Sequence, residues 1–384
     1  MHDANQASPP PPDPLPQPGS ALELPNPAES SDFHRFSSEL PPDRSEERGL
    51  TIWLAIVATA FVVSAVFQQA ELGLLTALGG MFAVAHAVDR NPRWTLLHNF
   101  LAWIPPVGGA LMFAGLAWYL KTVDLSPTER MTGLASAVIA AAITLLLAIR
   151  PVTDGFARVL FRTPAPGHSD RLAARLVVMG FLLLVPAWVA MGSLADSGLD
   201  SLSLGTGSFV GSVIGFTMLS LGAVGFAITR SVRETVARLG LERFGGRDVL
   251  AAGLGLAAIL ALNVVMEWFA VRFAPVSWAR DQAMNQMIAG RLTRTETLLL
   301  GVSAGIGEEL AMRGALQPRF GLVGTSLLFA VLHVQYSALG ILTIAALGMI
   351  LGAIRSRTST TTAITVHVLY DIVAAFGIQD QFGK

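Results

Sequence analysis

Two adjacent acids and an arginine interrupt a long hydrophobic stretch near the end of the chain. In GIGEELAMRG, residues 305–314, the charged residues Glu308, Glu309 and Arg313 lie between segments whose composition is typical of membrane spans. A charged side chain at the centre of a bilayer costs at least about 2.5–3.5 kcal/mol on insertion scales. Ionisable residues at such positions therefore need partners, and they indicate a functional site.

Helical spacing separates the roles of these three residues. Glu309 and Arg313 are four residues apart, so they share one helix face and are expected to pair. Glu308 points about 100° away from Glu309 and about 140° away from Arg313 around the same helix. Glu308 is therefore the acid least easily neutralised within its own helix, and it is our candidate general base. For Glu309 and Arg313, a structural ion pair and a direct catalytic role both remain open.

Further ionisable residues follow in the next hydrophobic segments. In FAVLHVQY, Phe329 precedes His333 by one helical turn, and in TVHVLYD, His367 precedes Asp371 by one turn. A carboxylate base combined with imidazoles that hold a metal ion or an oxyanion can activate water. Two histidines and one carboxylate around zinc, with a bound water, form a known catalytic set. These residue types therefore favour hydrolytic chemistry inside the membrane.

These elements, in this order, resemble the CPBP family of intramembrane proteases. The family includes the type II CAAX prenyl endopeptidases and the bacterial bacteriocin-processing and immunity proteins. Its motifs Glu-Glu-x-x-x-Arg, Phe-x-x-x-His and His-x-x-x-Asn/Asp correspond here to Glu308, Glu309, Arg313, Phe329, His333, His367 and Asp371. The resemblance covers roughly residues 250–380. It implies that Glu308 activates water and that His333, His367 and Asp371 complete the site.

The resemblance also carries expectations about cofactor and substrate. It allows a zinc ion held by Glu308, His333, His367 and Asp371, or water activated by the glutamate without a metal. Many family members have Asn in place of Asp371, and the added carboxylate favours a cation or a protonated neighbour. The implied substrates are lipidated or hydrophobic peptides and proteins associated with the lipid bilayer.

Composition excludes other classes of site. The chain has no cysteine, which rules out disulfides, zinc–thiolate sites and thiol nucleophiles. The net charge of −1 gives no indication of nucleic-acid binding. The segment GVSAG, residues 301–305, matches Gly-x-Ser-x-Gly, but a nucleophile elbow requires a strand, a turn and a helix. In a hydrophobic helix these small residues instead predict close helix packing beside the site.

The residues of the site must be positioned by membrane helices. Hydrophobic residues make up 52% of the chain and charged residues only 14%, against about 25% charged residues in soluble domains. A spanning helix needs about 20 apolar residues. Candidate segments are 51–68, 71–88, 100–120, 131–149, 173–192, 208–228, 248–271, 296–316, 322–337, 339–354 and 361–377. We therefore predict an all-α, polytopic integral membrane protein with about eight to eleven transmembrane helices, ending in a CPBP-type helical bundle.

Arginines in the connections predict the orientation. The connections 150–175, 229–247 and 355–360 are rich in Arg, whereas 193–207 contains neither Lys nor Arg. The positive-inside rule places the three arginine-rich connections in the cytoplasm, together with the N-terminus. We expect a cell-membrane location if the protein is bacterial, a short amphipathic surface helix within 229–247, and access to the site from the cytosol.

The chain divides into three predicted regions. Residues 1–48 are rich in Pro, Ser and acids and are expected to form a disordered tail. Residues 49–247 form membrane helices of open role, and 248–384 form the protease domain. A different class of function is also consistent with this pattern: a proton-coupled transporter, or a catalytically inactive membrane scaffold or immunity protein. Convergence of Glu308, His333, His367 and Asp371 on a water-sized cavity would favour the enzyme.

Overall fold

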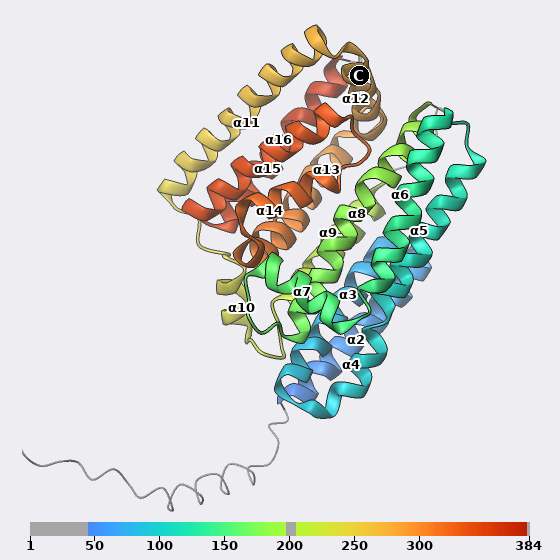
Figure 1. Ribbon diagram of the computed structural model, residues 1–384. Coiled ribbons are helices and arrows are strands. Elements are labelled where there is room, and N and C mark those ends of the chain that lie inside the picture. The colour runs from blue at the N-terminus through green and yellow to red at the C-terminus, as the bar shows by residue number, and fades with distance from the viewer. Residues whose placement is uncertain (1–44, 197–204, 382–384) are drawn as a thin grey trace, which may run out of the picture. The chain divides into compact units, whose positions relative to one another are not determined.

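A computed structural model describes residues 45–196 and 205–381, and the regular elements in these residues are helical (Figure 1). In chain order they are α2 (Ser45–Phe67), α3 (Ala70–Arg90), the 3₁₀ helix η1 (Pro92–Trp94), α4 (Thr95–Leu101), α5 (Ile104–Thr122), α6 (Pro127–Leu146), α7 (Arg150–Phe161), α8 (His168–Asp196), α9 (Thr206–Ala223), α10 (Val232–Arg238), α11 (Gly246–Phe273), α12 (Pro275–Ala289), α13 (Arg294–Glu309), the π-helix η2 (Leu310–Leu316), α14 (Gln317–Val331), α15 (Ala338–Arg357) and α16 (Thr360–Gln381).

The predicted fold class is confirmed. Within the described residues, nine helices are long and apolar enough to cross a membrane, and each of the eleven predicted segments coincides with a helix. The predicted segments 296–316 and 322–337 form the shorter helices α13 and α14, which are joined through η2 and are not among the nine candidate spans. The protein is therefore a polytopic, all-helical integral membrane protein.

Three helices lie where we predicted only connections. α4, α7 and α12 are too short or too polar to stand out in a search for apolar spans, although α7 is amphipathic and α12 contributes to the site described below. The short helix predicted within 229–247 is confirmed as α10, which begins with a capping box between Ser231 and Glu234. α2 begins at Ser45, inside the predicted tail, and the rest of that tail lies outside the described residues.

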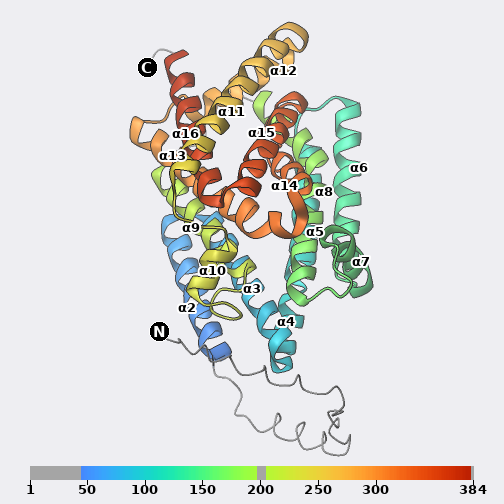
Figure 2. The same ribbon diagram turned by 90° about the vertical axis from the view of Figure 1, so that its left-hand side faces the viewer.

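The helices that carry the site belong to one group. Figures 1 and 2 show α11 to α16 together, with α8 and α9 alongside them. From the earlier part of the chain, the Arg238 side chain of α10 donates to the carbonyl oxygen of Gly314 in η2, at 3.0 Å. The described residues on both sides of position 247 also belong to one compact unit. The predicted boundary at 247 is therefore not a break in packing, and a separate role for 49–247 stays a prediction.

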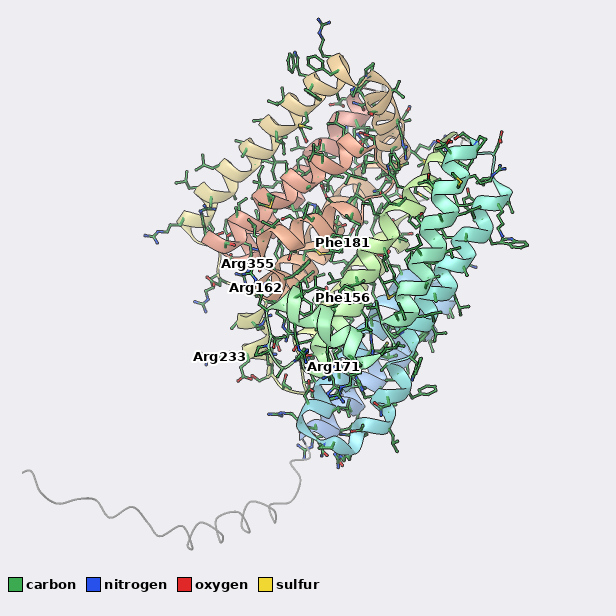
Figure 3. The ribbon with its side chains drawn as sticks, in the orientation of Figure 1. Phe156, Arg162, Arg171, Phe181, Arg233 and Arg355 are labelled. Atoms are coloured by element: carbon green, nitrogen blue, oxygen red, sulfur yellow. The ribbon has the colours of Figure 1, made fainter. Side chains whose placement is uncertain are left out.

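The two ends of the helix group differ. α12 lies at one end, whereas α4, α7 and α10 lie toward the other in both views. Figure 3 shows Arg162, Arg171, Arg233 and Arg355 away from α12. The arginine-rich connections are thus gathered toward one end of the molecule, as the positive-inside argument requires, while the orientation itself stays a prediction.

Small residues bring α13 close to α16. A Cβ atom added at Gly305 would lie 2.8 Å from the backbone nitrogen of Val368, and one added at Gly301 would lie 2.7 Å from Cγ1 of Ile372. The predicted close packing at GVSAG is therefore confirmed. Ser303 lies within α13 and donates to the Leu300 carbonyl oxygen of the same helix, which is not the geometry of a nucleophile elbow.

We expect Gly305→Ala to destabilise the protein by about 1–3 kcal/mol, because the added methyl group forces α13 away from the α16 backbone. The matched control is Gly253→Ala in α11, where an added Cβ meets no atom within 4 Å. That change should stabilise the helix by roughly 0.5–1 kcal/mol. Thermal unfolding of both variants in detergent checks the prediction, and equal midpoints for the two variants would contradict it.

An irregular segment follows the two glutamates. The π-helix η2 begins at Leu310, directly after Glu309, and carries Arg313. Single π-helical turns occur frequently at functional sites. Further along, Gly321 has φ +80° and ψ 169°, which breaks the helical path within α14. Side chains other than glycine rarely adopt this conformation, so a glycine at this bend is favoured.

Candidate active site

Four of the six predicted site residues line one cavity of about 500 Å³. They are Glu308 of α13, His333 in the connection after α14, and His367 and Asp371 of α16. Residues of α11, α12 and α15 complete the wall. The sequence argument thus selected residues from three separate segments that the structure brings together in one cavity. Their catalytic roles stay predictions.

His367 lies between two carboxylates. Its Nδ1 atom is 3.1 Å from Oε1 of Glu309, and its Nε2 atom is 3.4 Å from Oδ2 of Asp371. The contact with Asp371 is the one-turn pairing expected from the spacing. The contact with Glu309 joins α13 to α16, and the spacing within either helix does not reveal it. Both ring nitrogens of His367 are therefore engaged by acids.

Glu309 and Arg313 form the predicted pair behind the cavity. Arg313 Nε is 3.3 Å from Oε2 of Glu309, and both side chains are 0% exposed. The Arg313 guanidinium lies 4.9 Å from the centre of the Phe329 ring, and its Nη2 donates to the Gly348 carbonyl oxygen at 3.4 Å. Arg313 thereby links η2 to α14 and α15. These contacts favour the structural role over a direct catalytic one.

Phe329 is the packing centre for both histidines. Its ring centre lies 4.8 Å from that of His333, tilted by 54°, and 6.0 Å from that of His367, edge to face. Nδ1 of His333 lies 2.8 Å from the Phe329 carbonyl oxygen. A carbonyl oxygen only accepts, so Nδ1 carries the proton in this contact. Nε2 is then the ring atom of His333 that can act on a ligand.

Glu308 differs from the other acids of the site. Its side chain is partly exposed and lines the cavity. Within the part of the chain that the structure describes, no hydrogen bond or ion pair engages its carboxylate, whereas Glu309 and Asp371 both contact His367. The geometry thus agrees with the spacing argument, in which Glu308 is the acid without a pairing partner in its own helix.

A cluster of polar contacts from α12 holds the connection that carries His333. Asp281 accepts hydrogen bonds from the backbone nitrogen and the Oγ of Ser337, each at 2.6 Å. The hydroxyl of Tyr336 donates to Oδ1 of Asn285 at 2.9 Å. We did not predict these residues, because α12 lacks an apolar signature. The sequence feature that could have identified α12 is the polar run RDQAMNQ, residues 280–286, between two predicted spans.

Two further polar contacts join α11 to its neighbours in the cavity wall. Asn263 donates to the hydroxyl of Tyr370 at 2.8 Å. Gln282 donates to Oε1 of Glu267 at 3.4 Å. Glu267 therefore lies in the cavity wall as a helix-to-helix contact with α12.

The predicted zinc ligands do not fit a metal ion in this arrangement. Across residues 45–196 and 205–381, no three His, Asp or Glu side chains are grouped so that they could hold one ion. Each nitrogen of His367 lies within 3.4 Å of a carboxylate oxygen, from Glu309 on one side and Asp371 on the other. The predicted set of Glu308, His333, His367 and Asp371 is thus a set of cavity-lining residues in this geometry, and we derive no step through a metal.

The cavity extends toward the end of the molecule that carries α12. Its wall includes Trp278 of α12, Leu339 in the first turn of α15 and Ile378 near the end of α16. Arg355 and Arg357 lie at the opposite end of α15. Arg355 and Arg357 thus lie away from this part of the cavity wall, and access to the site from the cytosol stays a prediction.

Comparison with known proteins matches the part of the chain that carries the candidate site to a described family. Residues 291–373 match the family described as type II CAAX prenyl endopeptidase Rce1-like, which confirms the resemblance. All six predicted site residues fall within the match. "Uncharacterized protein YpbD" of Bacillus subtilis (strain 168) is 30% identical over 129 residues, which are 33% of this chain and 66% of that protein. No solved structure matches the chain.

Proposed function

Because residues 291–373 form an Rce1-like type II CAAX prenyl endopeptidase (CPBP) family domain, we propose that this protein is an intramembrane endopeptidase. Its proposed substrates are membrane-associated, either prenylated or hydrophobic peptides and proteins. The observation that carries the proposal is the unpaired carboxylate of Glu308 in a cavity that it shares with His333, His367 and Asp371.

In the proposed reaction, Glu308 accepts a proton from a water molecule in the cavity. The water oxygen attacks the carbonyl carbon of the scissile peptide bond, and negative charge develops on the carbonyl oxygen. Glu308 then delivers its proton to the leaving nitrogen as the carbon–nitrogen bond breaks. The products are a carboxylic acid and an amine, so that one water molecule is consumed.

The histidines have separate proposed roles. His333 has Nε2 available to orient the water or the substrate, because Nδ1 is held by the Phe329 carbonyl oxygen. His367 faces a carboxylate from each nitrogen and is arranged to be positively charged. A fixed positive charge beside the cavity stabilises the developing oxyanion. Asp371 supports that charge, which agrees with the expectation that an acid at this position favours a protonated neighbour.

We expect hydrolysis to persist after treatment with chelators, because the site residues do not fit a metal ion. The measurement is the cleavage rate of purified protein before and after chelator treatment and dialysis, with elemental analysis of bound zinc. A known zinc protease treated in parallel controls for the chelator. Loss of activity that returns only with added zinc would instead support the predicted zinc site and reject the metal-free mechanism.

We expect Asp281→Ala to lower kcat more than it raises KM, since Asp281, in the cavity wall, positions the His333 connection through Ser337. Removing a charged acceptor of two hydrogen bonds should also destabilise the protein by about 1.5–3 kcal/mol. The matched variant Asp281→Asn keeps one acceptor oxygen and should restore part of kcat. Equal loss in both variants, or a change confined to KM, would contradict this positioning role.

A further inference from the structure

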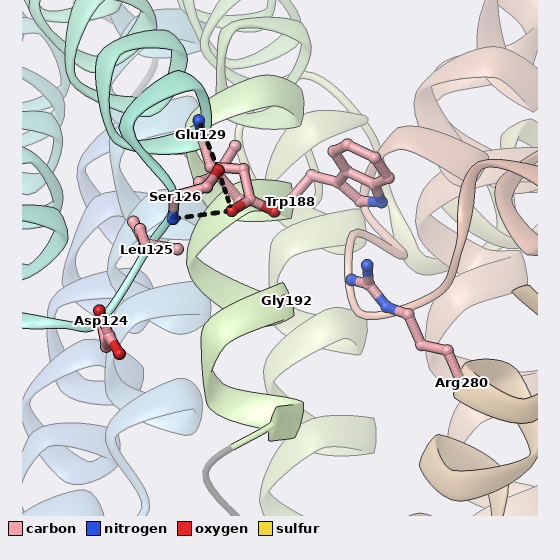
Figure 4. Close-up of a pocket in the computed structure, with 8 residues that line it drawn as sticks. Asp124, Leu125, Ser126, Glu129, Trp188, Gly192 and Arg280 are labelled. Atoms are coloured by element: carbon pink, nitrogen blue, oxygen red, sulfur yellow. Dashed lines mark hydrogen bonds between the residues drawn. The ribbon is translucent and has the colours of Figure 1, made fainter. Parts of the chain in front are cut away.

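A second cavity, of about 360 Å³, lies beside α12 on the other side from the candidate active site. Figure 4 shows its lining from the turn between α5 and α6, from the first turn of α6, from α8 and from α12. The lining residues are Asp124, Leu125, Ser126, Glu129, Trp188, Val189, Gly192 and Arg280. Nothing in the proposed reaction uses this cavity.

Arg280 gives the cavity an unsatisfied cation. Its Nε and Nη2 atoms are buried and make no hydrogen bond with any described residue. The guanidinium lies 5.4 Å from the centre of the Trp188 ring, which orients it but accepts none of its hydrogen bonds. Buried guanidinium donors are normally paired, and planar oxyanions are their best acceptors. The geometry therefore indicates an anionic group as ligand.

Gly192 leaves room for that group. A Cβ atom added at Gly192 would lie 3.7 Å from Nη1 and 3.9 Å from Nη2 of Arg280. A longer side chain at this position would therefore occupy the space in front of the guanidinium. A substitution at Gly192 can therefore fill the site without removing the charge of Arg280.

Two acids line the same cavity. Asp124 and Glu129 are exposed, and Oε2 of Glu129 accepts hydrogen bonds from the nitrogen and the hydroxyl of Ser126. With one arginine and two acids, the lining has a net charge of −1, which disfavours a ligand that is only anionic. A ligand with an anionic and a cationic group satisfies both sides.

The position of the cavity indicates where such a ligand comes from. Residues 123–126 connect α5 and α6, which are both candidate spans, so this turn lies where the chain leaves and re-enters the bilayer. Leu125, Trp188 and Val189 supply apolar surface beside the charges. Tryptophan is enriched at this depth of membrane proteins, where head groups lie. The cavity therefore combines charged and apolar surface at a depth that suits a lipid head group.

We propose that this cavity binds the head group of a zwitterionic phospholipid of the phosphatidylethanolamine type. Its phosphate contacts the Arg280 guanidinium, and its ammonium group contacts the carboxylates of Glu129 and Asp124. The ammonium N–H groups donate to these acids, which a quaternary choline group cannot do. This proposal does not rest on the proposed proteolysis, because its test measures lipid binding without any peptide substrate.

The test is native mass spectrometry of the full-length protein in detergent with phosphatidylethanolamine, phosphatidylcholine or phosphatidylglycerol. We expect phosphatidylethanolamine to bind at least about tenfold more tightly than the other two, and Arg280→Gln to remove about tenfold of that affinity. Gly192→Leu should block binding although Arg280 is intact. Glu129→Gln should reduce the preference for ethanolamine over choline. Thermal unfolding midpoints without lipid verify that each variant is folded.

Several results would overturn the proposal. Equal binding of all three lipids, or unchanged binding by both Arg280→Gln and Gly192→Leu, would show that this cavity is not the proposed head-group site. Stabilisation by inorganic phosphate or soluble phosphoethanolamine as strong as that by the lipid would show that a free anion is the ligand. If a hydrophobic peptide, but no lipid, stabilises wild type and not Arg280→Gln, the cavity is a peptide site instead.

Discussion

Glu308→Gln should lower the rate of peptide-bond hydrolysis by about 10²–10⁴-fold and leave the fold intact. Glutamine has nearly the same shape but cannot take a proton from water. The fold should tolerate the change, because the Glu308 carboxylate pairs with no other group in the described residues. The measurement is kcat on a panel of prenylated and hydrophobic peptides, with purified protein in detergent and an unfolding midpoint for each variant.

Glu309→Gln is the matched control for this prediction. The neighbouring acid contacts Arg313 and His367, so its replacement should lower the unfolding midpoint as well as the activity. The two variants thus separate loss of the base from loss of the framework. Hydrolysis that survives Glu308→Gln would reject Glu308 as the base. A wild-type protein that cleaves no peptide in the panel would favour the transporter or the inactive scaffold.

The sequence was most informative where one helix explains a contact. Hydropathy located each large span, because about 20 apolar residues are needed to cross a bilayer. The four-residue spacing predicted the Glu309–Arg313 and His367–Asp371 contacts, because such residues share a helix face. The same spacing argument singled out Glu308 as the acid without a partner in its own helix.

The sequence was least informative about contacts between helices. The Glu309–His367 contact depends on how closely α13 approaches α16, which the glycines of α13 allow but do not specify. α12 was missed because its 15 residues are too polar for a span, and with it Asp281 and Arg280 were missed. The sequence left a zinc site and a metal-free site both open for a related reason. Residue types identify possible ligands, but only packing shows whether three of them are grouped around one point, and within the described residues no such group occurs.

Arg313→Met should destabilise the protein by about 3–5 kcal/mol, one of the largest effects expected for a single substitution here. Methionine fills a similar volume but leaves the buried carboxylate of Glu309 with His367 as its remaining partner. The change also removes the donor to Gly348 and the cation above Phe329, which together hold η2 against α14 and α15. The measurement is the midpoint of unfolding in detergent for the variant and the wild type.

The double variant Glu309→Gln, Arg313→Met shows whether the pair itself stabilises the fold. The two side chains are 3.3 Å apart, which satisfies an ion pair, yet Oε2 of Glu309 and Nε of Arg313 are not hydrogen-bonded. A buried pair without hydrogen bonds gains little over neutral side chains of the same size. We therefore expect the double variant to recover part of the lost stability, since the contacts of Arg313 with Gly348 and Phe329 stay absent. Its activity should stay low, because His367 no longer faces a charged Glu309. Recovery of activity together with stability in the double variant would mean that Glu309 contributes only to the fold. A single Arg313→Met variant as stable as wild type would show that the Glu309 carboxylate is not buried as a charge.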